Sequence, residues 1–394
     1  MDSRQFRRLS EFYFFYFAVL GAFVPYRSRY FDGQGFDSFT IGLTASVISL
    51  TTIAAPYGWA AIADRFHAGH RVLLSGVIMS LIAVVIGLES RTAILMILAM
   101  AMYSLCWNAI LPQAETLTLS LTEKGGGNYS RIRLWGSIGY MLAVVGVGYG
   151  VEWWGVKIVE PVVIAFMLVL LISAWVLPRS EQQERNMLRH DRLREHFWQR
   201  PVIIFLFATI LVTISHAPYY TFFDLYMRKL GYTPSQSGWL ITLGVIAEIG
   251  LFMIAQSIIQ RWRFGLILHV ALIICALRWI MLATLGDWLP VLLLVQVLHA
   301  VTFALMHTLA MHFVHNKFPP KQRGRAQAIY SALTYGVGGA AGNFIAGAIW
   351  DSGRGGAATF MMSGVVCALA FVIVYFLWRR GDSAAPKPPP VDPE

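Results

Sequence analysis

Charged residues and cysteines are both scarce in this chain. Only 13% of its 394 residues are Asp, Glu, Lys or Arg, about half the share that soluble domains carry. A soluble globular domain is therefore excluded. The three cysteines, Cys106, Cys275 and Cys367, lie in apolar stretches and none belongs to a CxxC pair. This spacing supports neither a disulfide framework nor a thiolate metal site, and we expect each cysteine to be packed in the interior.

Hydrophobic residues, by contrast, fill 57% of the positions. Apolar stretches of about 20 residues recur from one end of the chain to the other, which is the length of an α-helix that crosses a ~30 Å hydrocarbon layer. We therefore predict an all-α membrane protein. Twelve spans are predicted near 10–29, 39–63, 71–88, 92–120, 130–151, 157–177, 201–227, 236–259, 265–285, 288–314, 325–350 and 356–378. The start of the chain has no small-residue cleavage site, so we expect the first span to be retained.

The basic residues follow the predicted topology. Lys and Arg outnumber Asp and Glu by 31 to 21, giving a formal net charge of +10. They concentrate at both termini and in the even-numbered connections, whereas the odd-numbered connections hold few. By the positive-inside rule, both termini are predicted to be cytoplasmic. The positive balance is thus a signal of topology and does not indicate nucleic-acid binding.

The longest polar connection divides six predicted spans from six. We predict an N-terminal six-helix bundle over 1–178, a cytoplasmic central loop over 179–200, a C-terminal six-helix bundle over 201–380 and a disordered tail over 381–394. Sliding the second half onto the first by 196 residues aligns several landmark residues. These are Tyr30 with Tyr226, Gly35 with Gly231, Gly42 with Gly238, Arg65 with Arg261 and Gly69 with Gly265. Such parallel repeats place a substrate site at the membrane midplane in many transporters.

Glu115 and Arg133 are charges within two neighbouring apolar segments. The turn between the segments centres on Lys124, nine positions from each of them. In antiparallel helices both residues would lie about 13 Å from the turn, near the middle of the hydrocarbon layer. Charges at that depth are functional candidates, so we predict that Glu115 and Arg133 form a pair. The pair either binds a substrate or locks the two helices together.

The loop after the second span carries an acid–base motif. Asp64 and Arg65 are followed by Gly69 and then by Arg71. This motif resembles the signature loop of the major facilitator superfamily, Gly-x-x-x-Asp-Arg, with Ala60 in place of the first glycine. The resemblance implies two six-helix bundles related by pseudo-two-fold symmetry, and conformational gating by Asp64, Arg65 and Arg71. An ordinary basic loop is the alternative.

The fourth and fifth predicted spans carry a closer resemblance. They read Pro112-x-x-Glu115 and then Arg131-x-Arg133-x-x-Gly136-x-x-Gly139-Tyr140. This is similar to lactose permease and its proton-symporter relatives. The resemblance implies that Glu115 and Arg133 bind substrate and that Tyr140 stacks on it. The further substrate-binding candidates are Asn108, Trp135 and Tyr26.

The second half is similar to the permease proton machinery, with informative gaps. Arg278 and His299 match its ninth-helix arginine and tenth-helix histidine, whereas Thr302 replaces its protonating glutamate. The charge partners of its seventh and eleventh helices are replaced together by the uncharged Tyr219, Phe222, Gln296 and Tyr335. Glu248 is the only carboxylate within the eighth predicted span. We hypothesise that Glu248 carries the coupled proton, tuned by Arg278 and His299. The alternative is a structural Glu248–Arg278 pair.

Together these features predict a secondary active transporter that works by alternating access. We find no nucleophile–base set or metal cluster, so we predict neither an enzyme nor a metal site. We also expect no cofactor, because the proton gradient would drive transport. The missing sugar-permease charges, the 14% aromatic residues and the inner Arg131 favour proton symport of an aromatic carboxylate of phenylpropionate type. A sugar, glycoside or nucleoside is the alternative substrate, and a non-transporting receptor is the alternative of another class. We expect a monomer in the bacterial inner membrane, with a small-molecule substrate, protons and membrane lipids as its partners.

Overall fold

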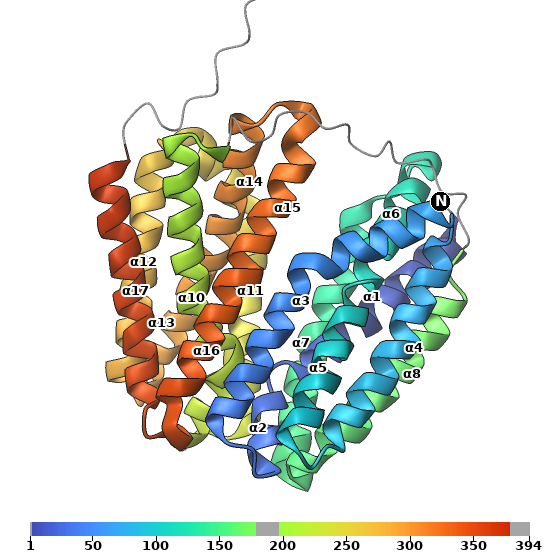
Figure 1. Cartoon of the computed structure of the whole chain (residues 1–394), viewed down its shortest axis with the longest axis horizontal. Coiled ribbons are helices and arrows are strands. Elements are labelled where there is room, and N and C mark those ends of the chain that lie inside the picture. The colour runs from blue at the N-terminus through green and yellow to red at the C-terminus, as the bar shows by residue number, and fades with distance from the viewer. Residues whose placement is uncertain (1, 179–196, 379–394) are drawn as a thin grey trace, which may run out of the picture.

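A computed structural model describes residues 2–178 and 197–378. The predicted central loop lies almost wholly outside these ranges, and the predicted tail lies entirely outside them. Within them the chain is helical and contains no strand, as predicted. Figure 1 shows two groups of helices side by side, one coloured blue to green and the other yellow-green to red.

The helices follow the predicted spans closely. The first group holds α1 (Ser3–Phe23), α2 (Arg27–Gly33), α3 (Ser38–Arg65), α4 (Gly69–Leu88), α5 (Ala93–Trp107), α6 (Ile110–Gly125), α7 (Tyr129–Trp154), η1 (Val156–Ile158) and α8 (Val159–Trp175). The second group holds α10 (Arg200–Lys229), α11 (Pro234–Arg261), α12 (Phe264–Leu285), α13 (Leu289–Ala300), η2 (Val301–Leu305), α14 (Met306–Lys317), η3 (Pro320–Gln322), α15 (Arg323–Ser331), η4 (Ala332–Gly338), α16 (Gly339–Trp350), η5 (Asp351–Gly353) and α17 (Gly356–Leu377).

Ten helical segments of the described chain are long and apolar enough to cross a membrane, and α1 with α2 makes an eleventh that is bent by 41°. The remaining predicted span, 325–350, corresponds to α15, η4 and α16, which follow one another without a break. Both η2 and η4 are π-helical turns inside longer helices. Turns of this kind often lie at functional sites.

The two groups share a local structure where their second long helices begin. Gly35 and Gly231 have left-handed φ angles of 92° and 88°, which glycine adopts without steric cost. Two residues later, Asp37 caps α3 and Thr233 caps α11, each accepting a hydrogen bond from the backbone N–H three positions on. Both pairs are 196 residues apart, so the backbone supports the internal repeat.

The groups touch where α3 crosses α16 and where α7 crosses α11. A Cβ added to Gly42 would lie 2.5 Å from the Gly347 Cα, and one added to Gly238 would lie 3.0 Å from the Val144 carbonyl oxygen. Backbone therefore packs on backbone at both crossings. Figure 1 shows the groups meeting near α2 and α16 and diverging toward the N terminus and α14. We call these the closed end and the chain-terminal end.

Candidate functional site

A cavity of about 330 Å³ lies between the two helix groups. This volume is at the lower end of the range typical of small-molecule pockets. The first group contributes Phe17, Leu20, Val24, Pro25, Arg133, Ser137 and Tyr140. The second contributes Tyr219, Tyr220, Ile241, Val245, Glu248, His299 and Phe303. The walls are therefore mostly apolar and aromatic, with a cation on one side and a carboxylate on the other.

The cation on the first wall is Arg133 of α7. Its guanidinium carbon lies 3.9 Å from the centroid of the Phe17 ring, a cation–π contact. Gly136, one turn further along α7, makes room for this stack, because a Cβ there would lie 2.6 Å from the Phe17 ring. Arg133 forms no ion pair with any residue in the part of the chain that the structure describes.

The predicted Glu115–Arg133 pair is therefore wrong for this conformation. Glu115 accepts a hydrogen bond from the Tyr129 hydroxyl at 3.2 Å and is not among the residues that line the cavity. The physical reason is the competing aromatic partner: the face of Phe17 takes the guanidinium that the sequence assigns to Glu115. As a result, Arg133 faces the cavity with its charge unmatched by a carboxylate.

The carboxylate on the second wall is Glu248 of α11. Its Oε1 lies 2.8 Å from His299 Nε2, and the two side chains are 16% and 5% exposed. Gly244, one turn before Glu248, lies against His299 and Gln296, which lets α11 approach α13 closely. The sequence thus identified two residues that the structure brings together on the cavity wall.

Arg278 lies behind this wall, fully buried, and does not pair with Glu248. Its Nε donates to the Val295 carbonyl at 2.9 Å, and its Nη1 donates to Thr302 Oγ1 at 3.2 Å. His216 Nε2 lies 3.4 Å from the same Nη1. The guanidinium carbon also stacks 4.0 Å from the Trp279 ring centroid. The alternative Glu248–Arg278 pair is therefore absent here, and the groups around Arg278 are polar and aromatic side chains and a carbonyl.

Of the four remaining substrate-binding candidates, one lines the cavity and three do not. Tyr140 lines the cavity. Trp135 is 43% exposed and does not line it, because it lies on another face of α7 from Arg133. Asn108 donates to the Ser104 carbonyl at 2.7 Å and also stays outside the lining. Tyr26 is fully buried and donates to the Val144 carbonyl at 2.7 Å, so it is a packing residue and not a wall of the cavity.

The predicted gating residues are at the chain-terminal end. Asp64 and Arg65 close α3, and Arg71 lies in the first turn of α4. None of the three forms an ion pair within the described ranges, and the Arg65 guanidinium packs over Phe66. These three side chains thus form no ion pair in the conformation in which the helix groups diverge at this end.

Ion pairs between the two groups occur at the closed end instead. Arg29 binds Asp224 through both carboxylate oxygens, at 2.5 and 3.1 Å, with side chains that are 9% and 2% exposed. A second pair joins Arg228 to Asp32 at 2.6 Å, with the two side chains 46% and 32% exposed. These contacts hold α2 against α10. Neither Arg29 nor Asp224 is among the site residues predicted from the sequence.

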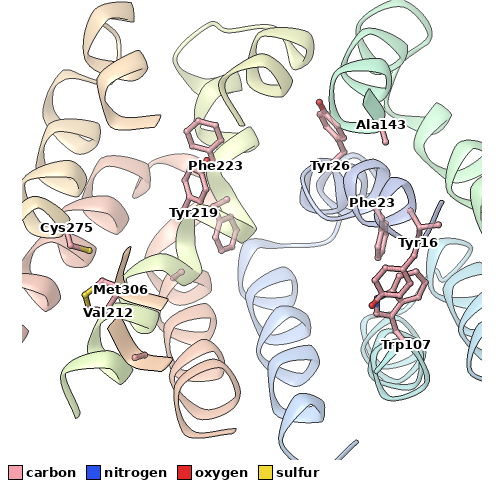
Figure 2. Packing of buried hydrophobic residues seen from close by; sticks show 14 of the residues in the cluster. Tyr16, Phe23, Tyr26, Trp107, Ala143, Val212, Tyr219, Phe223, Cys275 and Met306 are labelled. Carbon is pink, nitrogen blue, oxygen red and sulfur yellow. The ribbon is translucent and has the colours of Figure 1, made fainter. Parts of the chain in front are cut away.

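The aromatic residues that line the cavity were the hardest site residues to predict from the sequence. Figure 2 shows Tyr219 and Phe223 on α10 and, across from them, Tyr16 beside Trp107. Tyr16 stacks on Trp107 inside the first group at 4.6 Å, and Tyr219 donates its hydroxyl to Gln296 at 2.7 Å. Phe17, next to Tyr16, faces the cavity instead. Aromatic residues are common throughout membrane helices, so the composition alone could not separate wall residues from packing residues.

Comparisons with known proteins agree with this architecture. The probable 3-phenylpropionic acid transporter of Escherichia coli (strain K12) is 28% identical over 342 residues, covering 84% of this chain and 87% of that protein. The maltose permease of Geobacillus stearothermophilus is 27% identical over 379 residues, covering 95% of this chain and 94% of that protein. The crystal structure of nucleoside transporter NupG superposes with a TM-score of 0.85 at 17% identity, over 96% of this chain and 100% of the other.

A family model covers nearly the whole chain. The MFS_1 like family matches residues 6–362, which include both walls of the cavity and both ion pairs of the closed end. Its relatives are membrane transporters and not enzymes. This chain is therefore a multi-pass membrane transporter of the major facilitator class, and it belongs to the MFS_1 like family.

Proposed function

We propose that this transporter is a proton-coupled symporter of a small aromatic carboxylate of phenylpropionate type. The observation that carries the proposal is Arg133, which faces the central cavity among aromatic rings without a carboxylate partner. A planar guanidinium offers a bidentate site for a carboxylate. The ring of the substrate would pack against Tyr140 and, on the opposite wall, Tyr220 and Phe303.

The chemistry of the second wall supports proton coupling. Glu248 is held by one imidazole, is mostly buried and lies on the cavity surface, so a proton can reach it from the cavity. Protonation of Glu248 would remove the negative charge that opposes entry of an anionic substrate. Proton and carboxylate would then enter together, and the proton gradient would drive uptake.

The membrane topology that we propose for the chain rests on the distribution of Lys and Arg in the sequence. Both termini would lie in the cytoplasm of a bacterial cell, and the chain would act as a monomer in the inner membrane. The chain-terminal end, where the helix groups diverge, would then face the cytoplasm. The closed end, with the Arg29–Asp224 pair, would face the outside.

Binding to the purified transporter tests the substrate class. We would measure the affinity of 3-phenylpropionate, maltose and uridine for the wild type, for Arg133→Lys and for Arg131→Lys. The structure places Arg131 in the first turn of α7, exposed and outside the cavity lining, so it is no longer a candidate anion site and serves as a matched control. Lysine keeps the charge but loses the fork, so we expect the Kd for phenylpropionate to rise at least tenfold in Arg133→Lys, which is about 1.4 kcal/mol. Unchanged affinity in Arg133→Lys would overturn the carboxylate site.

A sugar or nucleoside is the second candidate substrate class. It is favoured by the similarity to maltose permease over 95% of this chain and by the fold shared with NupG. Hydroxyl groups of such a substrate would hydrogen-bond Glu248 and His299 as well as Arg133. Saturable binding of maltose or uridine without binding of phenylpropionate would select this class.

Proton movement tests the coupling separately. Addition of substrate to energised, weakly buffered cells should make the medium more alkaline if a proton enters with the solute. We expect Glu248→Gln to bind substrate but to lose both the alkalinisation and the uptake driven by a pH gradient. Glu123→Gln changes an exposed carboxylate in the last turn of α6; it is the control and should behave as the wild type. Full gradient-driven uptake by Glu248→Gln would refute the assignment.

A further inference from the structure

A second apolar groove runs along the outside of the first helix group, separate from the central cavity. It has a volume of about 240 Å³, lies between α1, α7 and α8, and all of its lining residues are apolar. Phe14 and Phe166 form its sides, and the α7 glycines Gly139, Gly146 and Gly150 form its floor. Leu142, at its rim, is 61% exposed. The groove therefore opens toward the surrounding lipid.

The length of the groove matches one leaflet of a bilayer. From Gly139 to Gly150 an α-helix rises about 16 Å, and half of the hydrocarbon core is about 15 Å. The groove starts beside Tyr140, at the depth of the central cavity, and ends at Trp154 near the closed end. Trp153 and Trp154 are 66% and 70% exposed, as expected of an aromatic belt at the membrane interface.

At one glycine of the groove floor, a larger side chain would not clash with any neighbouring residue. A Cβ on Gly139 would lie 2.2 Å from the Phe14 carbonyl oxygen, so that glycine is needed for the α1–α7 contact. A Cβ on Gly146 would meet nothing within 4 Å. Its small size keeps the middle of the groove open. An empty groove would deprive its lining of dispersion contacts.

A cation stands at the interfacial end of the groove. Lys157 is exposed and directly precedes Ile158, which lines the groove. Near a membrane surface a lysine attracts anionic lipid headgroups. Lipid tails are as apolar as the groove, so preference for a bound lipid over bulk lipid must come from packing and from this charge.

From the length of the groove, its apolar lining and its basic end, we infer that it binds one acyl chain of an anionic phospholipid, with the headgroup at Lys157. The site lies on the outer face of α1 and α7, the helices that carry Phe17 and Arg133 on their other side. A bound chain would fill the space between α7 and α8, which make few direct contacts with each other, and would stabilise the wall of the central cavity.

Native mass spectrometry of the purified transporter tests this site. The protein would be titrated with phosphatidylglycerol and, separately, with phosphatidylcholine of the same chains. Gly146→Leu fills the groove, and Gly250→Leu is the matched control, since Gly250 is an exposed glycine on α11 that also has nothing within 4 Å. We expect Gly146→Leu to lose the tightest lipid adduct, with at least a fivefold weaker Kd, while Gly250→Leu binds as the wild type.

The headgroup contact is tested by Lys157→Gln, a surface change that leaves the helices intact. We expect this variant to bind phosphatidylglycerol about fivefold more weakly, the effect of one lysine near an anionic surface, and to bind phosphatidylcholine unchanged. Equal lipid binding by wild type and Gly146→Leu would overturn the site. A wild-type dimer that Gly146→Leu dissociates would show that the groove holds a second copy of the chain, which would also overturn it.

Discussion

The buried Arg29–Asp224 pair provides the sharpest test of how the closed end is held. Asp224→Asn keeps the shape of the side chain but removes its charge. In the wild type, Arg29 bonds both carboxylate oxygens and also donates to the Asp224 main-chain carbonyl at 3.2 Å. Removing one partner leaves a buried guanidinium, and this penalty applies only while the two helix groups are together.

The size of the effect follows from the burial of the pair. Breaking a buried ion pair by removing one partner costs about 3–5 kcal/mol. The retained main-chain hydrogen bond and the acceptor oxygen of Asn place the expected value at the lower end, about 3 kcal/mol. At 1.4 kcal/mol per tenfold change, the closed conformation loses roughly 100-fold in relative population. A 99:1 preference would then fall to about 1:1.

Distances between spin labels on either side of the closed end measure this shift. Arg91 and Asp287, exposed residues after α4 and α12, would be labelled through cysteines in a background that lacks the native cysteines. We expect Asp224→Asn to add a population of longer distances that the wild type lacks. Asp351→Asn, which breaks the exposed Arg354–Asp351 pair within one helix group, should change nothing. An identical distance distribution in Asp224→Asn and the wild type would refute the reasoning.

Three further predictions concern packing and pH. Tyr26→Phe removes the hydrogen bond to the Val144 carbonyl, so the free energy of unfolding measured by thermal denaturation should fall by about 1–3 kcal/mol. The Kd of the substrate should stay unchanged, and weaker binding would show that Tyr26 contacts the substrate. Gly42→Ala would place a methyl group against Gly347, so spin-label distances across the closed end should increase. Unchanged distances would show that α3 and α16 can accommodate the methyl group without moving apart. The hydrogen bond and charge of Glu160 raise the pKa of Glu89, so the contribution of Glu89 to stability is present at low pH and is lost as pH rises above the ordinary glutamate value of about 4.3. Glu89→Gln should therefore flatten the decrease in melting temperature above that pH, and an unaltered slope would exclude this carboxyl as its source.

The sequence predicted the fold well because each span is specified locally. Twenty apolar residues form a membrane helix whatever their neighbours are. Gly35 and Gly231, both with left-handed φ angles, mark the same turn in each half of the chain. Glu248 and His299 were also found from the sequence, since charges in a span have few partners to choose from.

The pairing of Arg133 could not be predicted in the same way. Equal depth on neighbouring helices made Glu115 a sound candidate, but the choice between Glu115 and Phe17 depends on side-chain direction and on the space that Gly136 leaves. The Arg29–Asp224 contact joins residues 195 positions apart and exists only when the closed end is closed. Information of that kind lies in the packing of one conformation and not in local sequence.

The contact between Gly42 and Gly347 bears on what holds the closed end together. At this point backbone lies directly on backbone, and the hydrogen bonds from Ser46 to the Ala340 carbonyl and from Asn343 to Ser49 flank the contact. Opening must break these hydrogen bonds and both ion pairs of the closed end, and only the attraction between the exposed Arg228 and Asp32 weakens strongly as ionic strength rises. The population in which this end is open would then rise modestly with the salt concentration of the compartment that it faces.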